Sequence, residues 1–117
     1  AGNIVELIAR RTLDVDPSGN AFGPLDLTCV SEIGIVTADP TAAAAAITRS
    51  TGAPAYGEPS DDFIALGDER GLFIISRTGR PWAPARDRPG EPHPTRIDVA
   101  GPIDGLVRLD DGRVEIR

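Results

Sequence analysis

The sequence EIGIVTADPTAAAAAITRSTGAP, residues 32–54, decides the fold because it joins a β-prone run to a sharply delimited helix. Branched apolar residues predict a strand over residues 30–37. Asp39 is suited to cap the following helix, since its carboxylate can accept free amides of the first turn, and the proline after it fits the first helical position. A run of alanines then leads to Gly52, a typical residue just beyond a helix end. The pattern predicts a helix over residues 40–51.

Downstream of this helix, short apolar runs predict three strands, at residues 55–57, 63–66 and 72–75. Residues 68–71, Asp-Glu-Arg-Gly, have the composition of a hairpin turn between the last two of these strands. The prolines within residues 79–94 exclude regular secondary structure there. The predicted order is therefore strand, helix, strand, strand, strand, followed by a proline-rich loop.

The two ends of the chain also contain strand patterns. Residues 4–8 are a short apolar run with one acid and predict a strand, and the turn formers between residues 12 and 29 indicate a linker that joins two units. Near the C-terminus, residues 96–99 alternate polar and apolar side chains, and residues 106–109 and 113–116 flank Asp-Asp-Gly as in a hairpin. The sequence thus predicts an α+β fold with a preceding strand and a C-terminal β extension.

Composition limits the classes of function. The chain has 117 residues, 18 acidic and 12 basic, with a net charge of -6, so nucleic acid and an anionic membrane surface are not expected as partners. No apolar run approaches the ~20 residues that span a bilayer. The single cysteine, Cys29, and the single histidine, His93, exclude an intrachain disulfide, a thiolate metal cluster and any site that needs two imidazoles of this chain. We expect Cys29 to be a small buried apolar residue and His93 to be exposed in a loop.

Two segments echo each other, since residues 2–10 and 71–77 both begin with glycine, continue as an apolar strand and end near an arginine. The stretch Gly-Asn-Ile-Val-Glu-Leu at residues 2–7 resembles the final strand of a module of the vicinal oxygen chelate superfamily, which includes glyoxalase I, bleomycin-resistance proteins and extradiol dioxygenases. Residues 32–39 are similar to the opening strand of such a module, and residues 67–74 to its closing hairpin. The resemblance covers most of the chain and implies a βαβββ module of the glyoxalase-like type.

The resemblance divides the chain into five parts. Residues 1–11 would be the last strand of a preceding module, 12–29 a linker, 30–78 the βαβββ module, 79–94 the proline-rich loop and 95–117 the C-terminal β extension. The chain would then be the C-terminal portion of a two-module member. Because the cup-shaped cavity of the family needs two modules, the implied partner is the missing N-terminal module or a second copy in a homodimer.

The resemblance also implies candidate metal ligands. The glutamate that matches Glu6 binds a divalent metal inside the family's cup, and a carboxylate on a rigid strand suits such a cation. Glu32 stands where the family most often has histidine, whereas Ile75 takes the place of a further ligand and cannot bind metal. The implied cofactor is zinc, nickel, manganese or iron, with at most two ligands from this chain. Alternatively, Glu6 faces solvent or pairs with an arginine, and Glu32 is solvated at the start of a strand.

Trp82, the only tryptophan, lies in the proline-rich loop. It either anchors that loop to the sheet or forms a wall for an aromatic ligand. Arg80 belongs to a local basic cluster with Arg77, Arg86 and Arg88, which could bind a carboxylate or phosphate or could be solvated or paired with acids. Trp82 and Arg80 are therefore the candidate ligand-binding residues.

Three functions remain open. The first is a metal-dependent lyase, isomerase or dioxygenase in which the metal polarises two vicinal oxygens of a small substrate held in the cup. The second is a non-catalytic protein that sequesters a small molecule, as bleomycin-resistance-like relatives do. The third is an inactive fragment of a larger chain, an interpretation favoured by the missing methionine. In each case we expect a cytoplasmic protein.

Overall fold

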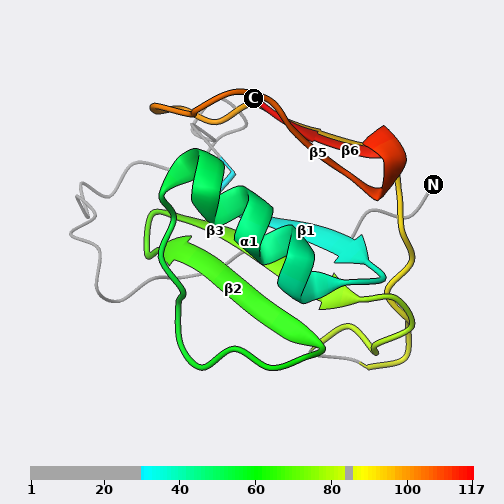
Figure 1. Ribbon diagram of the computed structural model, residues 1–117. Coiled ribbons are helices and arrows are strands. Elements are labelled where there is room, and N and C mark those ends of the chain that lie inside the picture. The colour runs from blue at the N-terminus through cyan, green and yellow to red at the C-terminus, as the bar shows by residue number, and fades with distance from the viewer. Residues whose placement is uncertain (1–29, 84–85) are drawn as a thin grey trace, which may run out of the picture.

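The computed structural model describes residues 30–83 and 86–117 (Figure 1). The predictions made for residues 1–29, including Glu6 and Cys29, lie outside these ranges. The described residues form an α+β fold, as predicted, with one α-helix and two small sheets. No helix among them is long and apolar enough to cross a bilayer.

The helix α1 spans Pro40–Thr51, as predicted. Its N-terminus is capped by Asp39, whose Oδ1 accepts the amide of Ala42 at 3.0 Å. Its C-terminus is closed by Gly52, which has a φ of 71° and donates its amide to the carbonyl of Thr48 at 2.8 Å. The buried side of the helix consists of Pro40, Ala43, Ala44 and Ile47.

The first sheet packs against one side of α1. Its strand order is β1-β3-β2, in which β1 (Glu32–Thr37) runs parallel to β3 (Gly71–Arg77) and β2 (Phe63–Asp68) runs antiparallel to it. Ile35 lies opposite Ile75 in the two parallel strands, and both side chains are buried in the core that includes the helix. The centre of this sheet is therefore a row of apolar side chains beneath α1.

The strand predicted at residues 55–57 is reduced to one antiparallel bridge, between Ala55 and Leu66. Two neighbours limit its length: Pro54 has no amide to pair, and Gly57 has a φ of 73°, outside the extended region. Counted with this bridge, the order is strand, helix, strand, strand, strand, consistent with the predicted βαβββ module.

The turn predicted at residues 68–71 joins β2 to β3 as a hairpin. The carboxylate of Asp68 accepts the amide of Arg70 at 2.8 Å, a local bond that stabilises the turn. Gly67 has a φ of 124°, and a Cβ atom there would lie 2.0 Å from the carbonyl oxygen of Gly71. The hairpin therefore requires glycine at this position.

A second sheet lies beside α1, above it in Figure 1, and shares one core with the helix and the first sheet. It consists of β4 (Thr95–Ile97), β5 (Val107–Leu109) and β6 (Val114–Ile116) in the order β4-β6-β5, with a short 3-10 turn, η1 (Asp110–Gly112), between the last two. The predicted C-terminal hairpin is thus confirmed, whereas the strand predicted at residues 96–99 begins one residue earlier and is shorter. The side chains of the second sheet that share the core with α1 are those of Val107, Leu109, Val114 and Ile116.

Candidate functional site

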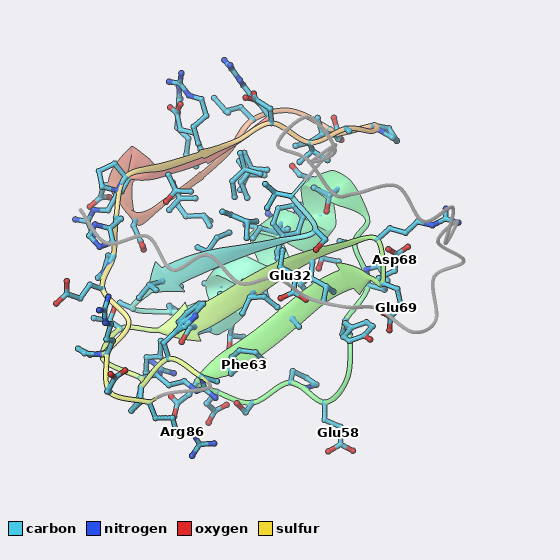
Figure 2. All side chains as sticks on the ribbon, turned by 180° about the vertical axis from the view of Figure 1, so that it is seen from behind. Glu32, Glu58, Phe63, Asp68, Glu69 and Arg86 are labelled. Carbon is cyan, nitrogen blue, oxygen red and sulfur yellow. The ribbon has the colours of Figure 1, made fainter. Side chains whose placement is uncertain are left out.

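The first sheet has a second face, turned away from α1. Because side chains alternate along a strand, the neighbours of the core residues lie on this side. Figure 2 looks at the molecule from behind, with Glu32 and Phe63 labelled on this side of the sheet and the helix behind it. We call it the distal face, and its residues in register are Glu32, Gly34 and Val36 of β1, Leu72, Ile74 and Ser76 of β3, and Phe63 and Ala65 of β2.

The proline-rich segment folds back on itself next to the distal face. The amide of Gly79 donates to the carbonyl of Gly90 at 2.8 Å, and the amide of Gly90 donates to the carbonyl of Arg80 at 2.8 Å. Residues 79–83 and 86–90 contain neither helix nor strand, as predicted for this segment. These hydrogen bonds hold the two ends of the loop together and fix the backbone position from which the side chains of Arg80 and Trp82 extend.

The indole ring of Trp82 lies directly on Gly34 of β1. A Cβ atom at Gly34 would be 2.7 Å from the ring atom Cη2 and 2.9 Å from Cζ2, so no larger residue fits without a shift. A glycine inside a strand often marks such a close approach. The contact makes Trp82 an anchor of the loop, one of its two predicted roles, and its role toward a ligand stays a prediction.

Arg80 reaches the same face from the same loop. Its guanidinium carbon lies 4.6 Å from the centroid of the Phe63 ring, within the range of a cation–π contact. Phe63 is the first residue of β2 and belongs to the distal face. The structure therefore brings both candidate ligand-binding residues, Arg80 and Trp82, onto one face of the sheet.

The remaining arginines of the basic cluster do not gather at one point. Arg77 is bound by Asp62, with 2.5 Å between Nε and Oδ1. Arg86 points away from the sheet into solvent (Figure 2), and Arg88 is exposed. Arg80 is thus the member of the cluster that contacts an aromatic ring of the distal face.

Ser76 is a residue that sequence analysis did not single out. It is 0% exposed, it lies opposite Val36 and Phe63, and its Oγ has no hydrogen-bond partner within the described part of the chain. A buried hydroxyl left unpaired costs about 1–3 kcal/mol. A serine near the end of a strand has no sequence signal that marks it as functional. The burial of Ser76 and its place on the distal face are known only once the register of the strands is known.

Glu32, a predicted metal ligand, is half-buried at the start of β1 on the distal face. No group of three His, Cys, Asp or Glu side chains able to hold a metal ion occurs within residues 30–83 and 86–117. The described residues by themselves therefore do not fit a metal ion. The predicted site depends on Glu6, which lies outside them.

Ile75, which by resemblance takes the place of a family ligand, lies on the helix side of the first sheet. It is 0% exposed and packs beneath α1, on the side of the sheet opposite Glu32. The reason is the two-residue period of a strand, by which an offset of one residue moves a side chain to the other face. Ile75 is therefore a core residue, and the β3 side chains on the face of Glu32 are those of Leu72, Ile74 and Ser76.

His93 is exposed in the segment before β4, as predicted. Its carbonyl accepts the hydroxyl of Thr95 at 3.0 Å. This local contact fixes the start of β4, and the histidine does not belong to the distal face.

Comparisons with known proteins bear on the fold. No protein-family model matches the sequence, and a search of curated proteins finds no match. Among solved structures, the crystal structure of a lactoylglutathione lyase from Agrobacterium tumefaciens is similar, with a TM-score of 0.49 and 12% identity over 76% of this chain and 92% of that chain. A likeness at this level assigns neither a family nor an activity to the chain.

Proposed function

We propose that the chain is a glyoxalase-like protein that binds a small molecule at the distal face, with Trp82 and Arg80 as ligand-binding residues. The observation that carries the proposal is the buried hydroxyl of Ser76, which has no hydrogen-bond partner among the described residues and lies on the face to which both residues are held. Apolar and aromatic surface with a few convergent polar groups is the usual lining of a small-molecule site. The favoured activity is binding without chemistry, the second of the three functions above.

The chemistry of the distal face indicates what such a ligand carries. The rings of Trp82 and Phe63 offer aromatic surface for stacking. Arg80 offers a guanidinium group that suits a carboxylate, and Ser76 offers a hydroxyl that can donate or accept a hydrogen bond. A small aromatic hydroxy acid combines these features and also presents two vicinal oxygens.

Fluorescence tests this proposal directly, because Trp82 is the only tryptophan. Titration with mandelate, which has a ring, a hydroxyl and a carboxylate, is expected to change the emission saturably. Benzyl alcohol, which lacks the carboxylate, is expected to bind more weakly. A flat response to a panel of aromatic acids, alcohols and diols would contradict the proposal.

A matched pair of variants separates the site from general charge effects. Arg80→Gln is expected to weaken mandelate binding about fivefold, or ~1 kcal/mol, as for a partly exposed charge pair. Arg49→Gln removes an exposed arginine from the last turn of α1 and is expected to leave binding unchanged. Equal effects of the two substitutions would remove Arg80 from the site.

A metal-dependent enzyme is the second candidate, favoured by the half-buried position of Glu32 on the distal face. In this proposal Glu32 and Glu6 contribute to holding zinc, nickel, manganese or iron, which would polarise two vicinal oxygens of the substrate. Metal analysis of the purified full-length protein is the test. Near-stoichiometric metal that is lost in Glu6→Gln and Glu32→Gln but kept in the exposed variant Glu58→Gln supports it, and equal content in all four proteins contradicts it.

We also propose that residues 1–11 belong to a preceding module and that a missing module or a second copy of the chain completes the cup. Light scattering of the purified protein tests the second copy, since a dimer doubles the mass. Comparison of the intact mass with the encoded gene product tests the missing module. A monomer whose mass equals that of the gene product would contradict both.

A further inference from the structure

A groove on the second sheet has no part in the proposed function. It is open to solvent, has a volume of about 350 Å³ and lies on the outward side of β4 and β6, where these two parallel strands begin. We call it the β4–β6 groove. Its lining residues are Pro94, Thr95, Arg96, Gly112, Arg113 and Glu115.

A row of alternating charge crosses the sheet at this groove. Arg96 of β4 lies opposite Glu115 of β6, which in turn lies opposite Arg108 of β5. One carboxylate contacts both arginines, with 3.5 Å from Oε2 to Nη2 of Arg96 and 3.3 Å from Oε1 to Nε of Arg108. The arginine side chains are 62% and 64% exposed and that of Glu115 27%, so the positive groups face outward.

Arg113 adds a second guanidinium group to the wall of the groove, beside that of Arg96. It is exposed, and its side chain makes no hydrogen bond or ion pair with any residue in the described ranges. Of the residues that line the groove, Arg96 and Arg113 are basic and Glu115 is acidic, so the lining carries an excess of one positive charge, and Arg108 stands next to it on the other side of Glu115. This surface stands out on a chain whose net charge is -6.

We propose that the β4–β6 groove binds a small organic anion, a phosphate monoester or a dicarboxylate, through Arg96 and Arg113. The excess positive charge of the lining attracts an anion, and the planar forks of the two guanidinium groups suit the paired oxygens of phosphate and carboxylate. Its volume is at the lower end of the range for ligand sites, about 300–1,000 Å³, which leaves room for more than an inorganic ion. Glu115 holds Arg96 and Arg108 in place before the ligand arrives.

The side-chain Nε–Hε signals of the ¹⁵N-labelled full chain report on each arginine. Phenyl phosphate and succinate serve as separate probes, with sodium chloride at equal ionic strength as the blank. We expect saturable shifts of Arg96 and Arg113 with a Kd on the order of 1 mM, and no shift of Arg70 in the hairpin turn. Saturation by either probe supports the site and identifies its ligand class, whereas shifts that rise linearly with both probes overturn it.

Two variants complete the test. Arg113→Gln, at an exposed position, is expected to keep the folded spectrum and to weaken binding of the saturating probe about fivefold. Arg70→Gln removes another exposed arginine that has no side-chain partner among the described residues, and binding is expected to be unchanged. Equal weakening by both substitutions, or none by Arg113→Gln, overturns the proposal.

Discussion

Thr37 donates its hydroxyl to Oδ1 of Asp110 at 2.8 Å, across 73 residues of sequence. Thr37 is the last residue of β1 in the first sheet, and Asp110 begins the turn between the two strands of the C-terminal hairpin. This hydrogen bond therefore joins the two sheets near the N-terminus of α1. The other carboxylate oxygen of Asp110, Oδ2, is buried and has no partner within the described residues.

Replacement of Thr37 by valine keeps the shape of the side chain and removes the donor. Thr37 is 2% exposed, so the carboxylate of Asp110 would be left without this bond in a buried place. We expect the free energy of unfolding to fall by about 2 kcal/mol, as for other hydrogen bonds to charged groups. Urea denaturation measures it, with the exposed helix variant Thr41→Val expected to stay within about 0.5 kcal/mol of the parent. Similar values for the two variants would mean that the sheets are held together without this bond.

The contact between Gly34 and Trp82 predicts an asymmetric effect of two glycine substitutions. Gly34→Ala places a methyl group 2.7 Å from the indole ring, so the ring must move off the strand. We expect a red-shifted Trp82 emission, stronger quenching by acrylamide and a loss of about 1–3 kcal/mol of stability from overpacking. Gly71→Ala, also in a strand, meets no heavy atom within 4 Å and is expected to change neither property. Identical spectra for both variants would contradict the ring placement.

Local signals predicted the helix well and the faces of the sheet poorly. The capping carboxylate of Asp39 and the left-handed Gly52 mark both ends of α1, and each acts within a few residues of sequence. The face of a strand residue depends instead on register with a distant partner. For this reason the sequence did not reveal that Ile75 and Ser76, although adjacent, lie on opposite faces of the sheet. The approach of Trp82 to Gly34 is also a long-range contact, for which a glycine within a strand was the only available signal.

The cap of α1 provides a prediction about the most locally determined element. Asp39→Ala removes the acceptor of the Ala42 amide and is expected to lower the free energy of unfolding by about 1 kcal/mol. The change would be measured by thermal unfolding followed by circular dichroism at a helix-sensitive wavelength. Asp87→Ala, at an exposed loop position, is the matched control and is expected to unfold like the parent. An unchanged midpoint for Asp39→Ala would mean that the alanine run sustains the helix without its cap.

Removal of the Ser76 hydroxyl is expected to affect the stability of the fold and the affinity for a ligand differently. Because this hydroxyl is buried without a partner among the described residues, Ser76→Ala is expected to leave the free energy of unfolding unchanged or to raise it by about 1 kcal/mol. Ser50→Ala is the matched substitution at a hydroxyl that has a partner, since Ser50 donates to the carbonyl of Asp104 at 2.7 Å, and we expect it to cost about 1 kcal/mol. If the distal face binds a ligand through Ser76, the affinity for mandelate falls in Ser76→Ala and not in Ser50→Ala. Equal destabilisation by both changes would show that Ser76 already has a structural partner, and the hydroxyl would then no longer point to a ligand.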